Sequence, residues 1–194
     1  LYGPAVAQLL DNLDLPAQQL ALEIGPGNGQ FLAELSCRFD KVIALDNNQP
    51  MLAQASEYVS THKLTNIELR CGEIADLSTD LSAADLKSTA LKPDCAVLNM
   101  VLHHTPSPAE VIAAVSKLLP ANAILLICEL SHHQQSWVRE ACGDIWLGFE
   151  PDELSRWFAQ ANLAGEHSQY LALRNGFQIQ IHAARKLPIF PPLV

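Results

Sequence analysis

Apolar residues follow two different spacings along this chain, and the two spacings alternate. Short apolar runs typical of buried strands cover residues 21–24, 41–45, 66–71, 94–99 and 123–130. Between them, apolar residues recur every three or four positions, as on one face of a helix, in 2–13, after residue 31, in 48–59 and in 107–120. Strands that alternate with helices predict an α/β domain built on a parallel sheet.

The last third of the chain departs from this alternation. Apolar positions at helical spacing predict an extra helix over residues 131–145 and another over 151–165. Strands are predicted over 168–174 and 177–184, and the Asn175-Gly176 pair between them is the strongest two-residue signal for a hairpin. The last two strands are therefore expected to be antiparallel. The polar residues 78–92 predict a surface segment.

A glycine-rich turn separates the first buried strand from its helix. Residues 25–29 read Gly-Pro-Gly-Asn-Gly. Glycine tolerates positive φ and leaves room above the backbone, so a ligand can lie against the turn and face the unpaired N–H groups of the helix. A dinucleotide fingerprint would need glycine at position 30, where this chain has Gln30. The turn predicts a small ligand and disfavours NAD.

An acidic residue follows the second strand at an informative distance. Asp46 lies 21 residues beyond Gly25. A carboxylate about 20 residues past such glycines is where the hydroxyl groups of a nucleotide ribose are held. Asn48 is better placed than Asp46 to cap the next helix. We therefore expect Asp46 to bind the ligand.

The pattern Glu23-x-Gly25-x-Gly27-x-Gly29 resembles motif I of the class I S-adenosylmethionine (SAM) dependent methyltransferases. Five strand–helix units and a terminal hairpin extend the resemblance along nearly the whole chain. It implies one domain over residues 1–194, with a Rossmann-like, doubly wound α/β sheet of seven strands. The implied strand order is 3-2-1-4-5-7-6, with the last strand antiparallel.

Residues 137–149 are also similar to the methyltransferase half that is found fused to bacterial ArsR-type regulators. No helix-turn-helix segment is visible in this sequence, so the regulator half would be absent. The chain begins without Met, which favours a trimmed start or a missing upstream domain.

The methyltransferase resemblance also implies the cofactor, SAM, and the product, S-adenosylhomocysteine. In that family the acid of motif I helps to hold the methionine end of SAM. Glu73 and Ile74 stand where the family has an acid for the adenine amino group and a backbone N–H for the ring, with Glu in place of the commoner Asp. The expected cofactor-binding residues are Glu23, Gly25, Pro26, Gly27, Asn28, Asp46, Asn47, Met51, Glu73, Ile74 and Asn99.

Methyl transfer needs alignment and, for a weak nucleophile, removal of a proton. Ligands of open α/β sheets bind at the carboxyl ends of the strands. Two histidine pairs follow such ends and are candidate bases: His103 and His104, and His132 and His133. Alternatively, each pair has one inward ring bonded to a backbone carbonyl and one solvated ring. We expect no metal site, because adjacent side chains diverge on a strand or a helix.

The segment 131–150 is longer than a plain strand–helix connection requires. It contains Trp137, Trp146 and Phe149, and Gly143 and Gly148 provide points at which it can bend. We expect it to be a lid that forms one wall of an apolar acceptor pocket. The competing interpretation is that these aromatic residues belong to the core.

Composition narrows the choice of partners. The formal net charge is −9 and no cluster of Lys and Arg is visible, so nucleic acid is not expected to be the acceptor. The sequence has neither an apolar run of about 18 residues nor a secretory leader, so we expect no membrane contact and a cytoplasmic location.

The five cysteines are odd in number and widely spaced, which predicts reduced thiols. Cys37 and Cys128 are expected to be internal and Cys95 to lie at the far edge of the sheet, so arsenite is disfavoured as the acceptor. The sequence favours a SAM-dependent methyltransferase that acts on a small molecule. The alternatives are a non-catalytic SAM-binding regulatory module and an NAD-dependent oxidoreductase.

Overall fold

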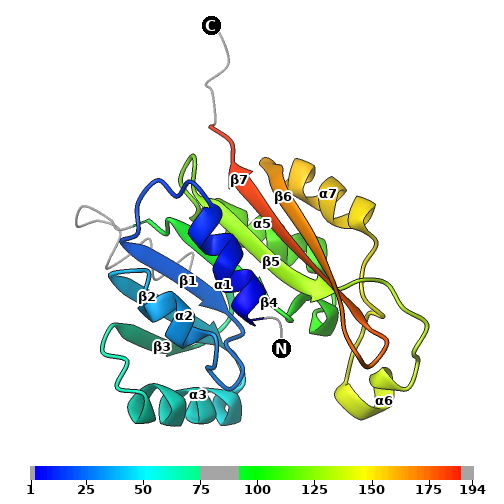
Figure 1. Cartoon of the computed structure of the whole chain (residues 1–194), viewed down its shortest axis with the longest axis horizontal. Coiled ribbons are helices and arrows are strands. Elements are labelled where there is room, and N and C mark those ends of the chain that lie inside the picture. The colour runs from blue at the N-terminus through cyan, green and yellow to red at the C-terminus, as the bar shows by residue number, and fades with distance from the viewer. Residues whose placement is uncertain (1–2, 75–91, 189–194) are drawn as a thin grey trace, which may run out of the picture.

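The computed structural model describes residues 3–74 and 92–188, which form a seven-stranded sheet with helices on both faces (Figure 1). The strands run in the order β3-β2-β1-β4-β5-β7-β6, as expected. Neighbours among β1 to β5 are parallel, and β7 is antiparallel to both β5 and β6. The strands are β1 Leu20–Ile24, β2 Lys41–Asp46, β3 Ile67–Cys71, β4 Cys95–Asn99, β5 Ile124–Leu130, β6 Leu163–Ala172 and β7 Gln178–Lys186.

Helices α1 (Gly3–Asn12), α2 (Leu32–Ser36) and α3 (Gln49–Thr61) cover one face of the sheet, and α5 (Pro108–Leu118) and α7 (Pro151–Gln160) cover the other (Figure 1). Each face has its own buried apolar cluster. One cluster includes Val6 and Leu32, and the other includes Ile112 and Leu154. Burial on both faces explains why β1 and β5 are apolar almost throughout. No helix among the described residues is long and apolar enough to cross a membrane.

Helix α7 ends five residues earlier than predicted, and β6 begins five residues earlier. The prediction continued this helix to Gly165, but Asn162 has a positive φ of 58° and ends it. The Asn162 side chain donates to the carbonyl of Leu187, which holds the end of the helix against the chain after β7. The predicted hairpin at Asn175-Gly176 is confirmed.

The helix predicted over residues 131–145 is wrong except for the short α6 (Val138–Cys142). The chain after β5 instead stays extended and pairs with residues 147–149. The backbone N–H of His132 donates to Phe149 and that of His133 to Leu147, at 3.0 and 2.9 Å. Gly148 permits this close approach, because a Cβ there would lie 2.4 Å from the carbonyl oxygen of Ser131. The surface segment predicted over 78–92 lies outside the described residues, apart from its last residue.

Candidate functional site

The glycine turn after β1 is packed against the chain that leaves β4. Gly25, Gly27 and Gly29 all have positive φ, between 56° and 80°. A Cβ at Gly25 would lie 2.6 Å from Cγ2 of Val101, so this position excludes any larger residue. A Cβ at Gly27 would meet Met51 at 3.8 Å, which places the Met51 side chain beside the turn. The structure thus brings the predicted turn, Met51 and the end of β4 together.

Unpaired polar atoms are concentrated at one edge of the sheet. Among the described residues, the buried side-chain atoms without a hydrogen-bond partner are Glu23 Oε2, Asn99 Oδ1, Ser131 Oγ and His133 Nε2. These residues lie near or just beyond the carboxyl ends of β1, β4 and β5. Each unpaired buried polar group costs about 1–3 kcal/mol. A polar ligand at this edge would satisfy these atoms.

Glu23 is the most perturbed of the predicted cofactor residues. Its side chain is buried near the end of β1, and burial raises the pKa of its carboxyl group to about 8. A cationic group of a ligand beside Glu23 would stabilise the ionised carboxylate and lower its pKa again.

The ends of β2 and β3 carry the next group of predicted residues. Asp46 Oδ1 accepts from the backbone N–H of Asn48. Asn48 caps α3 as expected, because its Oδ1 accepts from the backbone N–H of Met51 at 3.2 Å. The Asn47 amide donates to Glu73 Oε1 at 2.9 Å, so these two predicted residues are in contact across neighbouring strand ends. Ile74 is half-buried against the apolar cluster that includes Leu45.

His103 is buried in the 3₁₀ turn η1 (Leu102–His104), where its Nδ1 lies 2.7 Å from Glu129 Oε2. The alternative interpretation of this pair is therefore right about one inward and one solvated ring, but the partner of the inward ring is a carboxylate rather than a backbone carbonyl. Glu129 is fully buried on β5 and also accepts from Leu102 N at 2.6 Å and Leu130 N at 3.2 Å. Burial lowers the pKa of His103, but the hydrogen bond and the charge of Glu129 outweigh burial, and the net shift is upward.

Glu129 is a functional candidate that the sequence reasoning missed. The signal was present, because Glu129 is the lone charged residue in the apolar run over residues 123–130. A charge inside a buried strand needs a partner.

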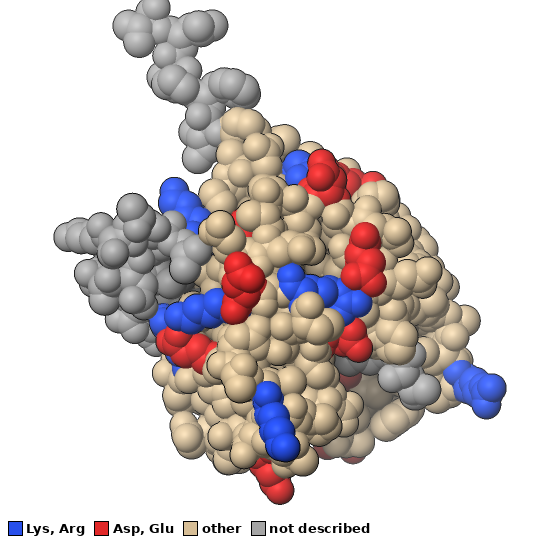
Figure 2. Space-filling model, turned by 60° about the vertical axis from the view of Figure 1, so that its left-hand side comes forward, with Lys and Arg blue, Asp and Glu red and all other residues tan. Residues whose placement is uncertain are grey.

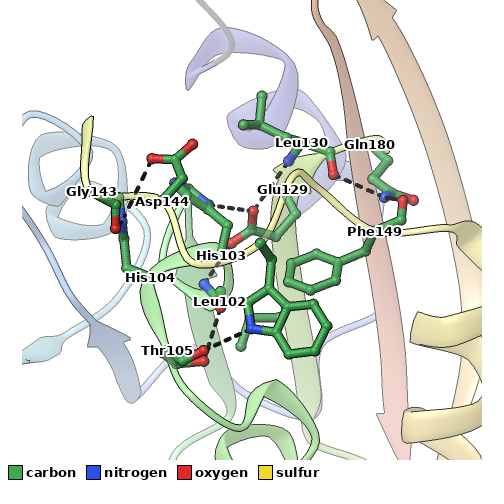
Figure 3. Close-up of polar contacts among 11 residues, drawn as sticks. Leu102, His103, His104, Thr105, Glu129, Leu130, Gly143, Asp144, Phe149 and Gln180 are labelled. Atoms are coloured by element: carbon green, nitrogen blue, oxygen red, sulfur yellow. Dashed lines mark hydrogen bonds and ion pairs between the residues drawn. The ribbon is translucent and has the colours of Figure 1, made fainter. Parts of the chain in front are cut away.

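His104 and Asp144 complete a cluster with His103 (Figure 3). His104 is exposed, whereas Asp144 is 6% exposed, and His104 Nδ1 lies 3.8 Å from Asp144 Oδ1. One ligand atom from each of the three residues lies within 4.8 Å of the others, so the group could hold a metal ion. The expectation that adjacent histidines diverge is wrong here. Both belong to a 3₁₀ turn, and their ring centroids are 4.0 Å apart.

In the second histidine pair, one ring lies in solvent and the other lies near the site. His132 is exposed, whereas His133 is half-buried against Phe177 with ring centroids 4.8 Å apart. His133 Nδ1 accepts from Gln135 N at 3.2 Å, so in the neutral ring Nε2 carries the proton. Burial lowers the pKa of His133. The charge of Asp144 raises it and that of His103 lowers it, and the net shift is downward. His133 is thus near the cluster and is a hydrogen-bond donor.

All five cysteines are free thiols, as expected. Cys95 and Cys128 are buried, and burial raises the pKa of the Cys95 thiol to about 12. Cys37 is exposed, which corrects the expectation that it is internal.

A family model described as a methyltransferase domain matches residues 2–175. The dimethyladenosine transferase of Schizosaccharomyces pombe is 27% identical over 71% of this chain and 47% of that protein. The ribosomal RNA small subunit methyltransferase A of Mycoplasma capricolum is 28% identical over 63% of this chain and 47% of that protein. The chain thus spans about half the length of these curated relatives.

Solved structures share the fold at low identity. The N-methyltransferase NodS of Bradyrhizobium japonicum, in complex with S-adenosylhomocysteine, superposes with a TM-score of 0.71 and 16% identity over 95% of this chain and 85% of that one. The [4+2]-cyclase SpnF superposes with a TM-score of 0.74 and 14% identity over 95% of this chain and 81% of that one. A cyclase with this fold means that the fold alone does not identify the reaction.

Proposed function

This chain belongs to the methyltransferase domain family, and we propose that it transfers the methyl group of SAM to a small-molecule acceptor and releases S-adenosylhomocysteine. The observation that carries the proposal is the row of unpaired buried polar atoms at the carboxyl edge of the sheet. The established ligands of open α/β sheets bind at this edge.

The residues around the glycine turn fit SAM. Glu23 Oε2 and Asn99 Oδ1 are buried acceptors without partners, which suits the ammonium and amino groups of SAM. Asp46 has a second carboxylate oxygen for the ribose, and Asn47, Met51, Glu73 and Ile74 would border the adenine. Gly25, Pro26, Gly27 and Asn28 would give the backbone surface for the methionine end. Bound SAM supplies an electrophilic methyl carbon on a sulfonium.

The acceptor would lie between the ends of β4 and β5. Ser131 Oγ and His133 Nε2 are buried and unpaired there, and His133 offers an N–H to an oxygen of the acceptor. For acceptors that must lose a proton, His103, His104 and His132 remain the proposed sources of a base, whereas His133 acts as a hydrogen-bond donor. These groups align the acceptor in line with the methyl carbon.

The segment 131–150 remains our candidate lid over this acceptor site. Gly143 and Gly148 have positive φ, at 77° and 73°, and Trp137 is 55% exposed. Phe149 is fully buried in the core, so a moving lid would lie between Ser131 and Gly148. The burial of Phe149 and the packing of Trp146 on the same cluster favour the core interpretation for these two aromatic residues.

RNA is a second candidate acceptor, because the name of one curated relative specifies ribosomal RNA. The net charge of −9 opposes this choice. Acidic and basic side chains are interspersed over the face drawn in Figure 2, and the described part of that face has no continuous basic area. A small molecule therefore stays the preferred acceptor, and a cytoplasmic location remains a prediction from the sequence.

Two measurements test the proposal. Calorimetry with SAM, S-adenosylhomocysteine and NAD should detect the first two ligands and not the third; tight NAD binding alone would favour the oxidoreductase. Methyl-labelled SAM should then label the small-molecule fraction of a cell extract rather than its RNA. SAM binding without any labelled product would favour the regulatory module that the similarity to ArsR-type fusions predicts.

A further inference from the structure

We propose that His103, His104 and Asp144 form a binding site for a divalent transition-metal ion of the Zn²⁺ class. Two imidazole nitrogens and one carboxylate oxygen are ligands that such ions take, and they lie within 4.8 Å of one another. Three protein ligands leave one coordination position for water or another oxygen ligand. The proposal goes beyond methyl transfer and does not depend on it.

The Asp144 carboxylate is placed to accept a cation. It is 6% exposed, and the ion pair found for it among the described residues is with His104, at 3.8 Å. No Lys or Arg in the described part of the chain lies within 4.0 Å of it. A carboxylate beside neutral imidazoles is stabilised by a positive charge placed next to it. A bound metal ion supplies that charge.

Glu129 prepares His103 as a ligand. Its carboxylate accepts the Nδ1 proton of His103 at 2.7 Å, which leaves the Nε2 lone pair available for coordination. A carboxylate behind a metal-binding histidine orients the ring and makes its nitrogen a stronger ligand. Two backbone N–H groups hold Glu129 in turn, at 2.6 and 3.2 Å. Figure 3 shows His103 between Glu129 and Asp144.

The backbone holds the two ligand segments together. Ile145 N and Trp146 N both donate to the carbonyl of His103, at 2.9 and 3.1 Å, which joins the chain after Asp144 to η1. Ligand atoms around tetrahedral Zn²⁺, with bonds of about 2.0–2.1 Å, lie roughly 3.4 Å apart. The most widely separated ligand atoms must therefore approach each other by up to about 1.4 Å. The exposed His104 would make this movement by side-chain rotation, which replaces its long Nδ1 contact of 3.5 Å to the carbonyl of Gly143.

A bound ion would change the role of the first histidine pair. Nitrogens that hold the metal cannot take a proton, so His103 and His104 would not act as bases in the loaded protein. The ion would supply a Lewis acid that lowers the pKa of an acceptor hydroxyl on the open coordination position, and the proton of that hydroxyl would pass to solvent.

Cobalt titration of the full chain, after EDTA treatment and dialysis, tests the site. We expect one Co²⁺ per chain with visible d–d absorption, and displacement by Zn²⁺. His104→Asn and Asp144→Asn should abolish the signal, and Glu129→Gln should weaken binding about 10–100-fold. His167→Asn, on the exposed side of β6, and Cys142→Ser, beside the cluster, should bind as the unchanged protein does.

Calorimetry with SAM on each variant separates loss of the metal site from loss of the fold or of the proposed function. Retained SAM binding with no Co²⁺ signal in His104→Asn supports the site. No signal in the unchanged protein, or an undiminished signal in both His104→Asn and Asp144→Asn, overturns it. Loss of the signal in Cys142→Ser would place the ion on a thiolate instead and would also overturn the proposed ligand set.

Discussion

Replacing Glu23 with Gln should remove a pH-dependent loss of unfolding free energy from the unliganded protein. Burial raises the pKa of the Glu23 carboxyl from 4.5 to about 8. A carboxyl group with a raised folded pKa contributes fully to stability below about pH 4.5, and that contribution is lost as pH rises toward about 8. At about 1.4 kcal/mol per pH unit, the upper limit of the loss is roughly 5 kcal/mol. Gln at this position stays neutral, so the Glu23→Gln protein does not lose this stability as the pH rises.

Urea unfolding of Glu23→Gln and of the unchanged protein, at pH values from about 5 to 8, measures the effect. All other groups are the same in the two proteins, so the difference between their unfolding free energies reports on Glu23. The two unfolding free energies should be similar at the acidic end, and Glu23→Gln should be the more stable protein by several kcal/mol at the alkaline end. Glu57→Gln, an exposed change on α3, is the matched control and should follow the unchanged protein. Parallel curves for Glu23→Gln and the unchanged protein would refute the reasoning.

Three further predictions concern the ligand. Asp46→Ala should weaken SAM binding by about 1.5–3 kcal/mol in calorimetry, the loss expected for hydrogen bonds to a charged group, and unchanged affinity would remove Asp46 from the site. Gly27→Val should abolish SAM binding while circular dichroism still reports a folded chain, because a branched side chain would fill the ligand's space; normal binding would contradict this. Residues 134–144, between the backbone pairs of His133 and Ile145, should exchange amide hydrogens quickly without S-adenosylhomocysteine and slowly with it, whereas protection in both states would identify core.

Local signals were sufficient to locate the strands and the glycine turn, and the methyltransferase resemblance supplied the strand order. The apolar runs and the Asn175-Gly176 turn locate strands because burial and turn geometry act over a few residues. Asn48 caps α3 as its position indicates. The end of α7 was misjudged because Gly165 looked like a terminator, whereas Asn162 adopts positive φ first.

The cluster of histidines and carboxylates depends on residues far apart in the chain. Glu129 bonds His103 across 26 positions, and Asp144 approaches His104 from 40 positions away. No spacing rule links such residues, since β4, β5 and the chain after α6 meet only once the sheet has formed. The helical pattern over 131–145 also failed for a nonlocal reason, because the backbone N–H groups of His132 and His133 pair with residues 147–149. The sequence by itself therefore determined where the strands and the glycine turn lie, and the tertiary structure decided which charges meet, because a buried carboxylate is stabilised by whatever partner the fold brings to it.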